Sequence, residues 1–213
     1  MNVTVFGATG AIGSLTVDEL LDRGHSVTAY ARNPAKIPTS WGKKVRVVIG
    51  EMSDAAAIDN AIASADAVVS ALGPAMDRKA TGLPLVDGTR HILDAMKRHG
   101  VTRYIGHGTP SLLDPREEPT WQTRLIGFMG RHALPRAYQE LLGMSRMIIN
   151  SGVNWTIVRF TAPRNTPKTG ELRVGFYGTD RIGFTVSRAD IAAFTAAQVN
   201  DDTYLNAAPA ISN

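Results

Sequence analysis

The chain has 213 residues, 44% of them hydrophobic, which is enough to bury one sizeable core but short for two full domains. It contains no cysteine, so disulfides, thiolate metal sites and cysteine nucleophiles are excluded. No apolar run reaches the roughly 18 residues of a membrane span, and the net charge of +4 comes from scattered lysines and arginines. We therefore expect one cytoplasmic domain, residues 1–213, with no nucleic-acid partner and no membrane partner.

Short β-branched runs alternate along the chain with segments whose apolar residues recur at helical spacing. The expected strands cover residues 3–6, 26–30, 45–49, 67–70, 103–107 and 155–160. The expected helices cover residues 11–23, 54–64, 83–99, 137–150 and 188–199. Strands that alternate with helices imply a parallel sheet, and the first five strands are apolar without alternation, as in strands covered on both faces. The pattern predicts an α/β fold with a doubly wound parallel sheet.

Three glycines lie where the first expected strand ends and the first expected helix begins, in the run Gly-Ala-Thr-Gly-Ala-Ile-Gly. One glycine permits a positive φ at the turn, a second lets the backbone approach a diphosphate, and a third lets helix and strand pack closely. The N–H groups of the first helical turn and the positive end of its dipole then face the diphosphate. The loop predicts a dinucleotide site that contains Gly7, Thr9, Gly10, Ala11, Ile12 and Gly13.

The end of the second expected strand indicates which dinucleotide is bound. NAD-specific sites place an acidic side chain on the ribose 2′-hydroxyl about 20 residues after the glycines, but this chain has no Asp or Glu between Asp22 and Glu51. The strand is followed instead by Arg32, whose guanidinium suits a 2′-phosphate. Arg32 therefore predicts NADP(H) as the cofactor, while a solvated arginine at a strand end remains the alternative.

Several stretches besides the glycine loop resemble a known family. They are residues 30–34, 71–73, 109–115, 151–159 and 186–192. With the loop, they resemble the atypical NAD(P)H-binding, NmrA-like branch of the short-chain dehydrogenase/reductase superfamily, and within it the flavin reductase and biliverdin-IXβ reductase-like proteins. The resemblance covers nearly the whole chain and implies a Rossmann fold in a single domain.

The resemblance also implies contacts to the cofactor. Where relatives often carry an Asp that touches the adenine, this chain has Met52, which we expect to pack on the ring instead. Ala71, Leu72 and Gly73 are expected to lie along the cofactor after the fourth strand, where small residues allow close approach. An ordinary turn from strand to loop would account for the same three residues.

Most reductases of this superfamily that act on alcohols and ketones use a Tyr followed four residues later by a Lys. Here the residues four positions after the five tyrosines are Pro34, Gly108, Leu142, Arg181 and Ala208. The flavin, tetrapyrrole and quinone reductases that the chain resembles also lack the pair, and they reduce conjugated acceptors that take their proton from solvent. The resemblance implies an NADPH-dependent reductase of such a planar acceptor, with a flavin as one candidate substrate.

Polar candidates for the reacting end of the site follow the fifth strand. Thr109 aligns with the Ser or Thr that relatives hold near the nicotinamide, which implies a positioning hydrogen bond; a structural threonine is an equal alternative. His107 lies on the same side of the strand and is a candidate proton donor near neutral pH, although a single His at a strand end is more commonly structural. Weaker candidates are Ser111, Tyr138, Arg159 and Arg164.

Residues 111–135 interrupt the alternation of strands and helices. The segment carries three prolines and two glycines around the apolar residues Trp121, Leu125, Ile126, Phe128 and Met129. We expect an insertion after the fifth strand, built of loops with short helical turns, that forms a mobile lid or a partner surface over the nicotinamide end. The alternative is that Trp121, Phe128 and Met129 fill the core.

Three functions are compatible with the sequence. The first is a reductase of a small molecule with a flavin-, quinone- or tetrapyrrole-like ring system. The second is a non-catalytic NADP(H)-binding redox sensor, like proteins resembling the nitrogen-metabolite repression regulator. The third, a nucleotide-sugar epimerase or dehydratase, is disfavoured by the missing Tyr/Lys pair. The histidines are scattered without metal-ligand spacing, so no metal site is expected, and the oligomeric state is not indicated.

Overall fold

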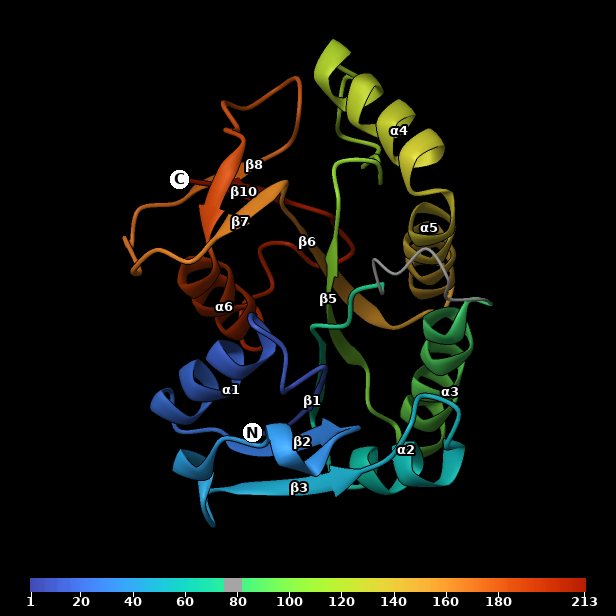
Figure 1. Ribbon diagram of the computed structural model, residues 1–213, viewed down its shortest axis with the longest axis vertical. Coiled ribbons are helices and arrows are strands. Elements are labelled where there is room, and N and C mark those ends of the chain that lie inside the picture. The colour runs from blue at the N-terminus through green and yellow to red at the C-terminus, as the bar shows by residue number, and fades with distance from the viewer. Residues whose placement is uncertain (75–81) are drawn as a thin grey trace.

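The computed structural model describes residues 1–74 and 82–213. Within these residues the main sheet has eight strands in the order β3-β2-β1-β4-β5-β6-β10-β8, and its pairs are parallel except β10 with β8 (Figure 1). Its strands are β1 (Asn2–Phe6), β2 (Ser26–Ala31), β3 (Val45–Ile49), β4 (Ala67–Ser70), β5 (Arg103–Gly108), β6 (Asn154–Arg159), β8 (Arg173–Gly175) and β10 (Ala210–Ser212). A separate parallel pair consists of β7 (Ala162–Arg164) and β9 (Thr185–Ser187). The predicted doubly wound parallel sheet is confirmed.

Helices cover both faces of the sheet (Figure 1). On one face, α1 (Gly13–Asp22) packs against α6 (Arg188–Ala197). On the other face, α3 (Pro84–His99) lies between α2 (Ala55–Ile62) and α5 (Pro135–Ile149). A further helix, α4 (Trp121–Ala133), contacts α5, and the short 3₁₀ helices η1 (Pro34–Lys36) and η2 (Thr39–Trp41) follow β2.

The core divides into two clusters, one on each face of the sheet. Successive residues of β1 point to opposite faces, so Val3 and Val5 pack with α1 and α6, whereas Phe6 packs with α2 and α3. All three side chains are at most 1% exposed. Burial on both faces explains why the first strands are apolar without alternation, because neither face meets water.

The expected elements agree closely with the observed ones in the first half of the chain and less closely in the second. Residues 45–49 and 67–70 coincide with β3 and β4. The insertion after β5, however, contains one continuous helix, α4, where loops with short turns were expected. The short strands β7, β8, β9 and β10 were not expected at all. Among the described residues, no helix is both long and apolar enough to cross a bilayer.

A buried ion pair attaches the start of the insertion to the sheet. The carboxylate of Glu117 accepts hydrogen bonds from both terminal nitrogens of Arg159 in β6, and both side chains are fully buried. Arg159 also donates to the backbone carbonyls of Leu112 and Ala208, while Glu117 accepts from the backbone N–H of Tyr177 at 2.7 Å. Arg159, a weak site candidate in the sequence, therefore has a structural role.

Candidate dinucleotide site

The order of the strands creates a crevice at the carboxyl ends of β1 and β4. From β1 the chain continues through β2 to β3 on one side, and then crosses to β4 on the other side of β1. In open α/β sheets, ligands bind where the strand order reverses in this way. A cavity of about 640 Å³ opens at this point, and it contains the glycine loop that follows β1.

The glycine loop is too closely packed to accept side chains at two of its positions. Gly7 has a φ of +72°, and a Cβ on it would lie 2.9 Å from the carbonyl carbon and oxygen of Ala71. A Cβ on Gly13 would lie 2.1 Å from the carbonyl oxygen of Gly7. These distances are shorter than any ordinary contact, so the turn and the approach of α1 both depend on glycine.

The amino terminus of α1 is open to an anion. Its N-cap residue, Ile12, makes no side-chain hydrogen bond to the helix, and the first turn carries no acidic residue. The partial positive charge of the helix end is therefore not neutralised by the helix's own side chains, and its backbone N–H groups suit a diphosphate. This cradle fits the diphosphate of a dinucleotide.

Most of the predicted cofactor residues line the cavity. They are Gly7, Thr9, Gly10, Arg32, Met52, Ala71, Leu72 and Gly73. Ala11, Ile12 and Gly13 do not line it; they form the start of α1 behind the loop. The cavity therefore joins the three chain segments after β1, β2 and β4 that the sequence placed in one site, together with Met52 after β3.

Two cations stand at the end of the cavity formed by the segment after β2. Arg32 is exposed and lines the cavity, and Lys36 at the end of η1 lines the same end. In the part of the chain that the structure describes, Arg32 forms no ion pair. The intervening Asn33 accepts a hydrogen bond from the N–H of Ala35 and so shapes the turn that carries Lys36. Two cations at this place suit a phosphate on the adenosine ribose.

Tyr30 forms part of the cavity beside the expected adenine position. Its hydroxyl donates a 2.8 Å hydrogen bond to the backbone carbonyl of Glu51, and burial raises the pKa of this phenol to about 12. The contact requires Gly50, because a Cβ there would lie 2.2 Å from the Tyr30 oxygen. Met52 packs against Gly88 of α3 while it lines the cavity, so its side chain is available to an adenine ring from one side.

The opposite wall of the cavity comes from α3 and α5. Glu140 of α5 is buried, and its carboxylate accepts a 2.8 Å hydrogen bond from the N–H of Leu85 in the first turn of α3. Arg136, one turn earlier in α5, donates to the same carboxylate over 3.4 Å. The carboxylate therefore caps α3 and holds the two helices together at the cavity.

Sequence reasoning missed this wall and part of the adenosine end. The missed lining residues are Tyr30, Ala31, Asn33, Lys36, Gly50, Glu51, Pro84, Leu85, Arg136 and Glu140. Those near β2 and β3 are sequence neighbours of predicted residues and could have been included on that ground. The α5 residues have no such signal, because Glu140 meets Leu85 across 55 positions of sequence.

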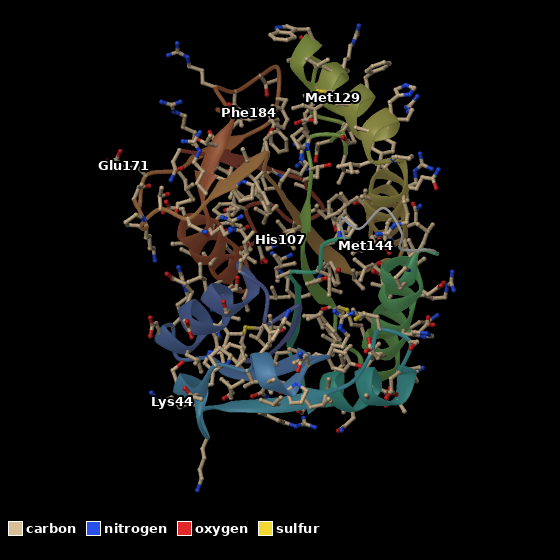
Figure 2. The ribbon with its side chains drawn as sticks, viewed as in Figure 1. Lys44, His107, Met129, Met144, Glu171 and Phe184 are labelled. Carbon is tan, nitrogen blue, oxygen red and sulfur yellow. The ribbon has the colours of Figure 1, made fainter. Side chains whose placement is uncertain are left out.

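The two residues predicted at the reacting end of the site do not line the cavity. Thr109 follows β5, and His107 lies within it. Thr109 is half-buried just beyond the strand, and its carbonyl accepts a hydrogen bond from Leu112. His107 lies in the middle of the molecule (Figure 2), where its Nε2 is 3.1 Å from the Thr195 hydroxyl of α6 and its ring packs edge-on against Phe160.

Burial decides the protonation of His107. It lowers the pKa of the imidazole from 6.5 to about 4, so the ring is neutral at neutral pH. A neutral imidazole that already has a partner in α6 favours the structural alternative for His107 over the proton-donor role. In the described part of the chain, no group of three or more His, Asp or Glu residues is arranged to hold a metal ion.

Together, the fold and the cavity define a Rossmann-type dinucleotide-binding protein. A family model described as NAD(P)H-binding matches residues 7–202. The chain therefore belongs to this NAD(P)H-binding family, which agrees with the NAD(P)H-binding resemblance of its sequence.

Curated relatives match parts of the chain. A 3-diazoavenalumate denitrifying reductase from Streptomyces sp is 27% identical over 190 residues, which cover 82% of this chain and 60% of that protein. An uncharacterized protein of Mycobacterium tuberculosis is 31% identical over 105 residues, 49% of this chain and 12% of its own length. The chain thus spans less than two thirds of these relatives.

Solved structures match the whole fold. A short-chain dehydrogenase/reductase from Veillonella parvula in complex with NADP has a TM-score of 0.79 at 21% identity and covers 100% of this chain and 94% of that chain. An anaerobillin reductase from Escherichia coli O157:H7 has a TM-score of 0.78 at 19% identity, covering 99% and 96%. At these identities the likeness shows the fold.

Proposed function

We propose that this protein is an NADPH-dependent reductase that transfers hydride to a planar, flavin-, quinone- or tetrapyrrole-like acceptor. The observation that carries the proposal is the composition of the cavity, in which a glycine loop with no room for a side chain at Gly7 is joined to Arg32 and Lys36. A loop of this kind suits any dinucleotide, whereas the two cations suit the additional phosphate of NADP(H).

Each part of the cavity would hold a different part of the dinucleotide. Gly7, Thr9 and Gly10 would lie against the diphosphate at the start of α1, while Arg32 and Lys36 would bind the 2′-phosphate. Met52 would pack on the adenine. When bound, the reduced nicotinamide supplies a hydride. What the chain then contributes is the fixed orientation of two reactants, which can provide much of the rate enhancement.

The acceptor class is supported by what the chain lacks and by the names of similar proteins. The full sequence contains no Tyr followed four residues later by Lys, so the usual proton donor for a ketone or alcohol is missing. Among similar proteins, one is a reductase of a diazo compound and another is an anaerobillin reductase. A conjugated acceptor that takes its proton from solvent fits both observations.

Thr109 is the proposed positioning residue at the reacting end. Its hydroxyl, just beyond β5, would orient the acceptor or the nicotinamide by one hydrogen bond. Replacing Thr109 by Ala should therefore cost roughly 0.5 to 1.5 kcal/mol, or a few-fold to tenfold in the rate of hydride transfer. Single-turnover rates for Thr109→Ala, with exposed Thr102→Ala as control, test this role. A hundredfold loss would indicate an obligatory acid instead.

Oxidation of the nicotinamide tests the function as a whole. Purified protein is mixed with NADPH or NADH and with FMN, FAD, a soluble naphthoquinone or a linear tetrapyrrole, and absorbance at the nicotinamide band is followed. The proposal expects turnover with at least one acceptor and a preference for NADPH. Tight NADPH binding without oxidation by any flavin, quinone or tetrapyrrole would move the protein to the class of redox sensors.

A further inference from the structure

Helix α4 presents its large apolar side chains to solvent. Trp121 is 71% exposed, Leu125 47%, Phe128 61% and Met129 57%. These four residues, here called the α4 patch, follow one another at intervals of four, three and one positions, which places them on one side of a helix. Figure 2 shows Met129 at the outer end of the molecule.

The side of α4 that faces the protein includes small and polar groups beside the partly buried Ile126. Thr123 is buried, and Gly130 lies so close to α5 that a Cβ there would be 3.0 Å from the ring of Tyr138. Most of the large apolar side chains of α4 therefore face solvent, whereas an ordinary surface helix buries its apolar side. The alternative that Trp121, Phe128 and Met129 fill the core is wrong, because these three side chains are exposed in the described structure.

The α4 patch lies in a segment with one sign of charge. Between residues 119 and 139 the sequence has three arginines, at positions 124, 131 and 136, and a histidine, but no Asp or Glu. Arg124 and Arg131 are exposed on α4 itself. On a helix of 3.6 residues per turn, these two arginines share one flank of the α4 patch. An apolar stripe flanked by cations is the pattern of a helix that lies in a membrane interface.

The same end of the molecule carries a further exposed aromatic residue. Phe184, which precedes β9, is 64% exposed, and Figure 2 shows it at the same end as Met129. The loop between β8 and β9 contacts the start of the insertion, because Gly178 approaches the Glu118 carbonyl so closely that a Cβ would lie 2.3 Å from its oxygen. Apolar side chains are thus presented by two neighbouring segments.

We propose that α4 docks this protein on anionic lipid surfaces, with the α4 patch in the interface and Arg124 and Arg131 among the headgroups. Charge favours this occupant over a second copy of the chain, because α4 has no acidic residue with which the arginines of another α4 could pair. The expectation of no membrane partner rested on the lack of a spanning segment, and an interfacial helix needs none.

Vesicle binding tests the proposal with a signal that reports on α4 alone. Of the three tryptophans, Trp121 is exposed, whereas Trp41 and Trp155 are 2% and 8% exposed. Vesicles that contain phosphatidylglycerol should therefore shift the emission of the full chain to the blue and should sediment it. Vesicles of phosphatidylcholine alone should do so much less, and salt should weaken the binding. Trp121→Phe should abolish the shift and retain sedimentation.

Matched variants distinguish binding through the α4 patch from nonspecific adsorption of the protein to vesicles. Phe128→Ser should lower partitioning onto the anionic vesicles about tenfold or more, whereas Ile149→Ser, at an exposed site on α5, should leave it unchanged. Replacing Arg124 and Arg131 together by Gln should weaken binding, whereas the same change at the exposed Arg90 and Arg146 should have much less effect.

Two results would overturn the proposal. One is a lack of sedimentation with anionic vesicles. The other is a concentration-dependent dimer that Phe128→Ser dissociates while vesicle binding is absent or unaffected, which would assign the α4 patch to a second copy of the chain. Since vesicle binding needs no acceptor, either result leaves the proposed reductase activity untouched.

Discussion

The glycines of the loop after β1 and Gly127 of helix α4 have opposite surroundings. In the loop, Gly7 and Gly13 allow backbone segments to approach one another within distances that a Cβ would block, and the space above them is the cavity. In α4, a Cβ on Gly127 would meet nothing within 4 Å, and the large side chains point away from the body. The loop is built to hold a ligand inside the fold, whereas α4 is built to expose a surface.

Adding one methyl group in each region tests whether the two regions differ in this way. Gly13→Ala would place a Cβ 2.1 Å from the Gly7 carbonyl oxygen, so α1 must shift and the diphosphate cradle is lost. We expect NADPH binding to fall at least about a hundredfold, or roughly 3 kcal/mol. Calorimetric titration with NADPH measures the loss, and circular dichroism checks that the chain still folds.

Gly127→Ala is the matched change in α4. Because nothing lies within 4 Å of the added group, the expected result is unchanged NADPH affinity and a gain of roughly 0.5 to 1 kcal/mol in unfolding free energy from helix propensity. If Gly127→Ala impaired NADPH binding as strongly as Gly13→Ala, the two regions would not be independent and the comparison would fail.

The buried pair of Glu117 and Arg159 joins the insertion to the sheet, and breaking it should also have a large effect. Arg159→Met leaves a fully buried carboxylate without its cation, which should cost about 3 to 5 kcal/mol of unfolding free energy. Adding Glu117→Gln should recover much of this loss, because an amide oxygen still accepts from the Tyr177 N–H without a buried charge. Urea unfolding of the two variants measures both changes in unfolding free energy. If the double variant recovers no stability, the loss in Arg159→Met comes from the altered packing and not from the unpaired charge.

The two regions also differ in how well the sequence predicted them. The first five strands are short, mostly apolar runs bounded by turn residues, so the local pattern located their ends within one residue. The spacing of the glycines in the loop likewise identified the turn before α1. In α4, Gly127 and Gly130 between Pro119 and Pro135 lower helix propensity, and tertiary packing of Gly130 on Tyr138 outweighs it. The three-residue strands β7 to β10 form only through pairing with distant segments, which no local pattern encodes.

The candidate site was predictable in the same uneven way. The residues after β1, β2, β3 and β4 line one cavity, as parallel strands with a common edge require. The place of Glu140 in the cavity wall could not be predicted. A glutamate within a helical pattern has the same sequence signature whether its side chain meets solvent or caps another helix. Only the packing of α5 against α3 brings Glu140 to the N–H of Leu85.

A further prediction concerns the cationic end of the cavity, which Arg32 and Lys36 form. Arg32→Glu should remove a charged hydrogen bond to the 2′-phosphate and erode the preference for NADPH over NADH by roughly 1.5 to 3 kcal/mol. Competition titrations with both dinucleotides measure the preference, and Arg46→Glu, at an exposed arginine in β3 outside the cavity, controls for net charge. Equal affinities of the unmodified protein for NADPH and NADH would contradict the assignment of Arg32.

The last prediction concerns His107, which lies between the two regions (Figure 2). Its pKa is lowered from 6.5 to about 4 by burial, so the unfolded chain takes up a proton below pH 6.5 that the folded chain excludes. The free energy of unfolding should therefore fall as the pH drops from 6.5 towards 4, by at most about 1.4 kcal/mol per pH unit from this group.

The variant His107→Gln cannot titrate but retains an amide that can hydrogen-bond to Thr195, so it should lose less stability over the same range. Its stability relative to the unmodified protein should therefore improve between about pH 7 and about pH 5, as urea unfolding at the two values would show. His25, whose pKa is also lowered by burial, titrates in both proteins and cancels in this difference. Parallel pH profiles would mean that His107 is protonated in the folded state, which would restore it as a proton donor at the carboxyl end of β5.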